Sequence, residues 1–258
     1  MSDASTREAV QAAGGPIEEI VATFMLHPET FDQSTASGYP HPFAGYFAGR
    51  GGVLGEADAN AVSAVFAFFE PNVVKMFWEQ GLPVHGAAGG AKLYSEQVAG
   101  FARKYLKDAE GMDRLAALGE KVADAAGDLA LPLFAGWRRM PLADDAPARA
   151  LQLMFVLREL RFGIHASAVA LSGLTPVEAH MLNRGAEYCA FFGWSEPFAS
   201  GEDKKDRYEA AEESTNQRMT EIVAAALNPE EAAELARLAD AALQTVKAAT
   251  PPTEGGPR

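Results

Sequence analysis

Apolar residues recur through most of this chain at the three- and four-residue spacing that places them on one face of an α-helix. Sustained alternation of apolar and polar residues, which predicts a half-buried strand, is absent. The pattern predicts helices over residues 56–69, 72–80, 91–107, 112–126, 148–171, 205–227 and 229–249. We therefore expect an all-α or predominantly α fold, with a short hairpin near Trp194 left open.

Two helix starts are marked by capping sequences. Thr175-Pro176-Val177-Glu178 has the form of a capping box with proline as the first helical residue. Asn228 followed by Pro229 likewise places a capping residue before a proline at the start of the last predicted helix. Pro16 is expected to begin a helix, because it precedes the apolar run that starts at Ile17.

Glycine and proline mark the segments between helices. Residues 30–52 are rich in Ser, Gly, Pro and aromatics and are predicted to be loop-like, and three prolines divide residues 132–147. The resulting domain prediction has a flexible N-terminal lead (1–15), a helical unit (16–145), a second helical unit with a long central helix (146–249) and a disordered tail (250–258).

A weak similarity between two stretches of the chain suggests a duplicated unit. Both Gly52 and Gly173 open a stretch that continues through a glutamate to an Ala-Phe-Phe triplet, at Ala67 and at Ala190. Two related helical units would produce this similarity, and so would chance in a chain rich in Ala and Phe.

Composition narrows the class of protein. The 258 residues carry a net charge of −13, which repels a phosphate backbone at long range. A single cysteine, Cys189, excludes an internal disulfide and suits a reducing compartment. We find neither a signal-peptide pattern at the N-terminus nor an apolar run long enough to span a membrane. The expected location is the cytoplasm, with no membrane partner.

The segment from Ser167 to Leu182 has the sequence pattern of a helix-turn-helix. A helix rich in small residues leads to Gly173, which permits the left-handed backbone of a tight turn, and the capping box at Thr175 begins the next helix. At this point the chain resembles winged-helix folds of the MarR type.

A more specific resemblance joins Arg158-Glu-Leu-Arg-Phe-Gly-Ile-His165 with the GLTPVEAHML that begins at Gly173. These motifs, the FAGRGGVLG at residues 47–55 and the Glu-Ser-Thr-Asn at 213–216 are similar to those of a largely uncharacterised actinobacterial family described as having a MarR-like helix-turn-helix fold. Members often carry an acidic residue and a glycine where this chain has Gly163 and Ile164, and an aspartate at Asn216. The resemblance implies a fold and no settled function.

The second helix of this segment offers few groups that bind DNA. Its candidate donors and acceptors are Glu178, His180, Asn183 and Arg184, with no dense Lys/Arg cluster nearby. Nucleic-acid binding is therefore not expected, and a transcriptional regulator is kept as an alternative.

A polar stripe crosses the most apolar predicted helix. Arg158, Arg161 and His165 stand at i, i+3 and i+7 and so share one face, while Glu159 points toward a neighbouring helix. Charges on a buried helix need partners. Two interpretations remain open: internal salt bridges with acids such as Glu209, Glu213 or Asp145, or a pocket that recognises an anion.

The functional prediction is a protein that binds a small, partly apolar anion through Arg158, Arg161 and His165, with Arg50 of the glycine-rich GRGGVLG run as a further contact. An enzyme with His165 as general acid–base, assisted by Glu159, is the first alternative. The histidines lack metal-binding spacing, so no metal is predicted, and no cofactor is assigned. A homodimer is left open.

Overall fold

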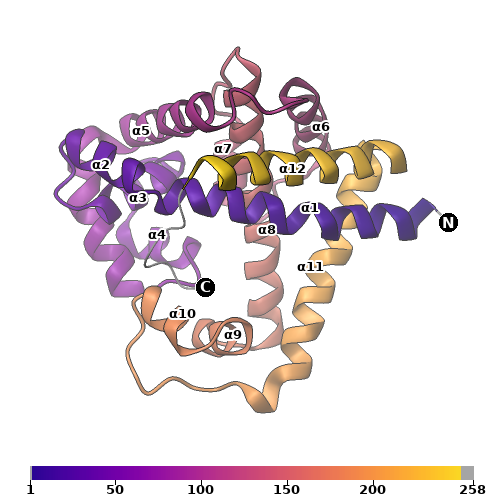
Figure 1. Ribbon diagram of the computed structural model, residues 1–258. Helices are drawn as coiled ribbons and strands as arrows, with labels where there is room; N and C mark the ends of the chain where they lie inside the picture. Colours follow the sequence, from indigo (N-terminus) through magenta and orange to yellow (C-terminus); the bar gives the residue numbers. More distant parts are fainter. Residues whose placement is uncertain (1, 251–258) are drawn as a thin grey trace.

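The structure, a computed structural model, describes residues 2–250 and is built from helices, with no β-strand among these residues (Figure 1). The α-helices are α1 (Ser2–Leu26), α2 (Pro28–Ala36), α3 (Pro42–Gly51), α4 (Ala59–Val65), α5 (Pro71–Tyr105), α6 (Met112–Ala125), α7 (Pro132–Trp137), α8 (Ala146–Ser172), α9 (Pro176–Asn183), α10 (Ala186–Phe191), α11 (Lys205–Ala226) and α12 (Pro229–Ala249). Short 3₁₀ turns, η1 (Gly52–Leu54) and η2 (Glu202–Lys204), join some of them. The expected all-α fold is confirmed.

The capping signals mark helix starts as predicted. The Thr175 side chain accepts from the Glu178 backbone N–H while the Glu178 carboxylate accepts from the Thr175 N–H, which makes a complete capping box at α9. Asn228 and Glu231 do the same at α12. The strength of these local signals explains why both boundaries are readable without tertiary information.

The predicted loop over residues 30–52 is wrong, because this stretch contains most of α2 and all of α3. Both helices begin with a proline preceded by a histidine, and in each case the imidazole Nδ1 accepts a backbone N–H as the cap. Histidine is an uncommon capping residue, so this start signal is easily missed.

The N-terminal helix also differs from expectation. It begins at Ser2 rather than at Pro16, so residues 2–15 of the predicted flexible lead are helical. Ala9 and Ala13 are buried in the main core, and α1 lies along α12 (Figure 1). Tertiary packing therefore outweighs Gly14, Gly15 and an internal proline. The predicted disordered tail lies outside the described residues, apart from Thr250, which caps α12.

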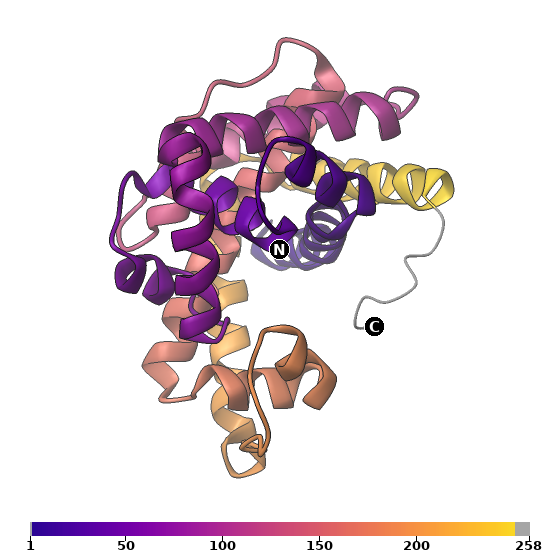
Figure 2. The same ribbon diagram turned by 90° about the vertical axis from the view of Figure 1, so that its left-hand side faces the viewer.

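Helix α8 is the axis of the molecule. Its first half, from Ala148 to Leu160, is almost wholly buried, with α5, α6, α7 and α11 packed around it. The second half extends past this core and ends at Gly173, whose φ of 72° makes the turn into α9. Figures 1 and 2 show that α9 and α10 form a lower level, which α8 and α11 connect to the level of α1 and α12.

Glycines let α3 and α5 approach closely. A Cβ added to Gly81 would lie 2.3 Å from the Ala44 carbonyl oxygen and 2.8 Å from the Ala48 Cβ, far inside normal contact. Gly100, on the same helix, would meet nothing within 4 Å. The backbone of α3, and with it Arg50, is therefore held where only glycine fits on α5.

We predict that Gly81→Ala lowers the free energy of unfolding by about 1–3 kcal/mol, because the two backbones must separate. Gly100→Ala, the matched control in α5, should raise it by about 0.5–1 kcal/mol through the better helix propensity of alanine. Urea denaturation measures both. Equal effects of the two substitutions would contradict this account of the α3–α5 contact.

Candidate functional site

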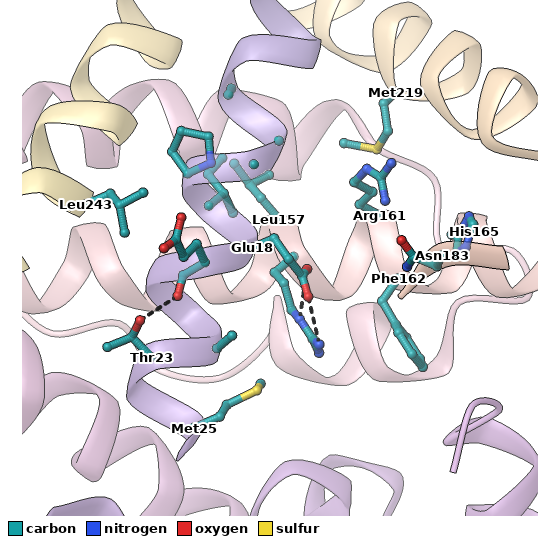
Figure 3. Close-up of a pocket in the computed structure, with 18 of the residues that line it drawn as sticks. Glu18, Thr23, Met25, Leu157, Arg161, Phe162, His165, Asn183, Met219 and Leu243 are labelled. Atoms are coloured by element: carbon teal, nitrogen blue, oxygen red, sulfur yellow. Dashed lines mark hydrogen bonds and ion pairs between the residues drawn. The ribbon is translucent and has the colours of Figure 1, made fainter. Parts of the chain in front are cut away.

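A cleft of about 1930 Å³ lies between the two levels of the fold. Residues of α1, α3, α8, α9, α10, α11 and α12 line it, together with Phe68 and Phe69 from the turn after α4. Figure 3 shows Arg161, His165 and Asn183 at one end of the cleft and Thr23, Met25 and Leu243 at the other. The volume is larger than the roughly 300–1,000 Å³ of a typical small-molecule site.

The polar stripe of α8 faces this cleft. Arg158, Arg161 and His165 are all lining residues, as the i, i+3, i+7 spacing predicted for one shared face. Their side chains are 13%, 32% and 14% exposed, respectively. The stripe therefore runs from the buried middle of α8 toward its more open lower half.

Arg158 is the most enclosed of the three. Its guanidinium contacts Glu18 of α1, with Nη2 donating to Oε1 at 3.3 Å, and Glu159, with Nη1 donating to Oε1 at 3.1 Å. Its Nε lies 3.3 Å from Glu18 Oε2 without hydrogen-bond geometry. Burial opposes the charge of Arg158, but these two carboxylates more than offset it and raise its pKa.

Arg161 and His165 share Glu212 of α11. Arg161 Nη2 donates to Glu212 at 3.1 Å and to Asn216 Oδ1 at 3.4 Å. His165 Nε2 lies 3.6 Å from Glu212, and its Nδ1 is 3.2 Å from the Thr215 hydroxyl. Burial lowers the pKa of His165, with Arg161 adding to the effect and Glu212 opposing it.

Arg50 lies behind this stripe and forms a bidentate pair with Glu159. Arg50 Nε and Nη2 each donate to a Glu159 oxygen at 2.8 Å, and Nη1 donates to the Tyr46 hydroxyl. The pair is 1% and 0% exposed, and the rings of Phe66 and Phe162 lie 4.8 and 4.6 Å from the guanidinium carbon. Arg50 borders the cleft, and each of its three nitrogens already donates to Glu159 or Tyr46.

The structure does not bring Glu159 to His165, so the predicted acid–base pair does not form. Glu159 turns toward α3 and is held by Arg50 and Arg158, whose charges outweigh burial and lower its pKa. The carboxylate next to His165 is Glu212, which the sequence did not single out. Helical spacing predicts the face of a residue, but it does not name the partner on another helix.

The acids proposed as salt-bridge partners from the sequence are not those found. Glu213 pairs with Arg7 and Asp145 with Arg103, both away from the stripe, and Glu209 is exposed. Glu18 and Glu212 take their place. The salt-bridge network and the pocket therefore coexist, because Glu18 and Glu212 line the cleft together with the arginines that they pair.

An aromatic wall forms the lower side of the cleft. The ring of Phe68 stacks on His165, with the two ring centroids 5.6 Å apart, and also contacts His180. The centroid of the His180 ring lies 4.5 Å from that of Phe192 and 5.1 Å from that of Tyr188. These rings come from α8, α9, α10 and the turn after α4. Except for the buried His180, each is partly exposed, so the wall presents aromatic surface to the cleft.

Helix α9, the second helix of the helix-turn-helix, turns two of its polar side chains inward. Glu178 is buried and pairs with Lys204, and His180 is bonded to the Phe68 carbonyl oxygen at 2.9 Å. Asn183 and Arg184, at its end, line the cleft and are exposed. Of the four residues considered for DNA contact, two are thus engaged inside the fold and two lie at the cleft.

The glycine-rich run and the single cysteine have structural roles. In the GRGGVLG run, a Cβ at Gly52 would lie 2.3 Å from the Ala87 carbonyl oxygen, so this glycine allows tight packing. Cys189 is buried, its thiol donates to the Val177 carbonyl oxygen, and burial raises its pKa.

Within residues 2–250, no group of three or more His, Cys, Asp or Glu is arranged to hold a metal ion. None of the helices described is long and apolar enough to cross a membrane.

We predict that Glu159→Gln lowers the free energy of unfolding by about 3–5 kcal/mol, because Arg50 would remain buried without a countercharge and Arg158 would keep only Glu18. Glu221→Gln is the matched control, since Glu221 pairs with Arg218 at 2.9 Å on the surface and that pair is worth at most about 1 kcal/mol. Chemical denaturation of both variants checks the difference. A loss below about 1 kcal/mol for Glu159→Gln would show that the pair is not a structural requirement.

The buried histidines predict a pH dependence of stability. Burial lowers the pKa of His180, and its bond to Phe68 only partly opposes this. The unfolded chain, in which histidine has a pKa of about 6.5, then binds a proton more readily than the folded protein. The stability gained by burying neutral His180 is therefore fully present above pH ~6.5 and is lost as the pH falls below that value.

The free energy of unfolding should therefore fall between about pH 7.5 and 5.5, and His180→Gln should reduce that fall. Gln80→Ala, at an exposed side chain of α5 that carries no titratable group, is the control and should leave the pH dependence as in the wild type. Urea titrations at the two pH values give the measurement. An unchanged dependence in His180→Gln would mean that His180 is not held neutral by the fold.

Comparison with known proteins agrees with this architecture. A family model described as a helix-turn-helix family matches residues 10–253, which takes in nearly the whole chain. No curated protein and no solved structure matches it. The α8–Gly173–α9 turn and a match of this extent lead to one conclusion: the chain belongs to this helix-turn-helix family.

Proposed function

We propose that this protein binds a small, partly apolar anion in the cleft beside α8 and does not bind DNA. The observation that carries the proposal is the row of Arg158, Arg161 and His165 along one wall of a 1930 Å³ cleft. On this proposal the scaffold is a MarR-like helix-turn-helix that senses or carries a ligand. The finer features retained from the sequence, a cytoplasmic location and an actinobacterial type of family, belong to the same proposal.

Arg161 is the residue of the stripe best suited to hold an anion. It is 32% exposed, more than Arg158, and only its Nη2 is engaged, by Glu212 and Asn216. A guanidinium has five N–H donors in a planar fork. Its other donors therefore remain for a carboxylate or phosphate oxygen, while Glu212 keeps the side chain in place.

The rest of the lining suits an apolar body. Leu157, Phe162, Met219 and Leu243 border the cleft beside the charged row, and the aromatic wall closes its lower side. Burial of apolar surface supplies most of the binding energy in such sites, and a few polar groups fix the orientation. A molecule with one charged end and an apolar remainder fits this division.

The proposed absence of DNA binding rests on α9 and on charge. A recognition helix needs exposed donors, yet Glu178 and His180 are buried and engaged. The chain as a whole carries a net charge of −13, which opposes approach to phosphate. We do not propose enzyme chemistry by His165 and Glu159, because Glu159 is committed to Arg50.

Screening of small carboxylates and phosphates by thermal shift, followed by calorimetry, tests the proposal. Arg161→Ala should weaken the best hit by roughly 10-fold or more, since a hydrogen bond to a charged group is worth about 1.5–3 kcal/mol. Arg218→Ala, at an exposed arginine of the same chain outside the cleft, is the control and should bind as the wild type does.

Two outcomes would contradict the proposal. If wild type and Arg161→Ala respond alike to every hit, the stripe does not hold the anion. If the protein retards its own upstream DNA in a low-salt gel shift at submicromolar concentration, the absence of DNA binding is wrong.

A further inference from the structure

We propose that the ligand is an aromatic monocarboxylic acid whose carboxylate binds between Arg184 and Arg161 and whose ring lies on the aromatic wall at Tyr188 and Phe192. This inference rests on the proposed function and specifies the ligand class of the same cleft. The juxtaposition behind it is a cation without an acidic partner next to partly exposed aromatic rings.

Arg184 differs from the other cations that line the cleft. Each of the others has a carboxylate partner: Arg50 has Glu159, Arg158 has Glu18, Arg161 has Glu212 and Lys247 has Glu19. Within the described part of the chain, Arg184 has no carboxylate within ion-pair distance. Its positive charge is therefore the one that an arriving anion neutralises without displacing an acid of the protein.

Arg184 and Arg161 act on the same region of the cleft. The hydroxyl of Tyr208, on α11, donates to Glu212, the partner of Arg161. Tyr208 also packs against the small core cluster that Leu182 contacts, and Leu182 lies two residues before Arg184. Arg161, from α8, and Arg184, from the end of α9, therefore border the same part of the cleft, with Asn183 lining it beside them.

The wall next to Arg184 consists of rings. Arg184 itself lies over the Tyr188 ring, with its guanidinium carbon 5.1 Å from the centroid. Tyr188 is 4.8 Å from Phe192, which is 5.4 Å from Phe191, and all three line the cleft with part of their surface exposed. A planar ring gains offset or edge contacts here that a flexible alkyl chain does not.

The number of free charges sets the charge of the ligand. With one unpaired cation and the remaining donors of a paired one, the cleft neutralises a single negative charge, whereas a second charge would face Glu212 or Glu187. A carboxylate also matches the two oxygens to two planar guanidinium groups. A monoanion attached to an aromatic body therefore satisfies both parts of the site.

Calorimetry with 2-naphthoate as the probe tests the inference against two analogues. Decahydronaphthalene-2-carboxylate keeps the charge and approximate size without the aromatic ring, and 2-naphthylmethanol keeps the ring without the charge. We expect 2-naphthoate to bind most tightly, the saturated acid about 2- to 10-fold more weakly, and the alcohol about 10-fold or more weakly.

Arg184→Gln should weaken 2-naphthoate by about 10-fold or more and leave the alcohol unchanged. Arg184 is exposed, so this variant keeps the fold. Arg237→Gln is the matched control, because Arg237 is an exposed arginine of α12 outside the cleft, and it should bind like the wild type.

The outcomes separate this inference from the proposed function. If Arg184→Gln binds 2-naphthoate like the wild type while Arg161→Ala loses it, the inference is overturned and the anion site on α8 stands. If the saturated acid binds as tightly as 2-naphthoate, the aromatic class is wrong. If no acid binds and neither arginine variant changes any response, both proposals fall together.

Discussion

The buried pair between Arg50 and Glu159 is the interaction on which the site depends. It joins α3 to the middle of α8 through two 2.8 Å hydrogen bonds in a region without solvent, where each charge alone would be costly to bury. The α3 backbone that carries Arg50 is in turn held by its glycine contacts with α5. Because Glu159 is fixed toward α3, helical geometry places Arg158 about 100° and Arg161 about 200° around the axis from it. Both arginines line the cleft at these positions. The orientation of the stripe is thus a consequence of a structural ion pair.

The stripe combines ion pairs with a position on the wall of a cleft, the two features that the sequence left as alternatives. Buried arginines require acids, and Glu18 and Glu212 provide them from α1 and α11. Both acids line the cleft themselves, so the ion pairs are part of its wall. Under the proposed function, this pairing would order the guanidinium groups before a ligand arrives and so lower the entropy cost of binding. An arginine that is paired on one side and open on the other would then be better suited to recognition than one that is free to move.

Much of the fold could be predicted from the sequence because its signals are local. Apolar periodicity gave α6, α8, α11 and α12, and proline with a capping side chain gave the starts of α9 and α12. The stripe was predicted for the same reason, since three residues on one helix have a fixed relation. The contacts that could not be predicted are non-local. No local rule predicts that Glu18 crosses to Arg158, or that Phe68 lies on His165, because those contacts depend on how helices distant in sequence are packed. The α2 and α3 starts were missed because histidine served as the cap.

Under the proposed function, the position of α9 explains how a helix-turn-helix could bind a small ligand. In a DNA-binding protein the second helix lies at the surface so that its side chains reach base edges. Here α8 continues beyond the core, and the turn at Gly173 brings α9 back beneath the cleft, where α10, α11 and Phe68 cover it. The residues at its end, Asn183 and Arg184, then line the cleft while remaining exposed. The turn and the capping box of the motif are retained, but the packing of its second helix determines which groups that helix can contact. In this family member the turn positions two walls of one cleft, and the chemistry of those walls, arginine opposite aromatic rings, limits what they can bind.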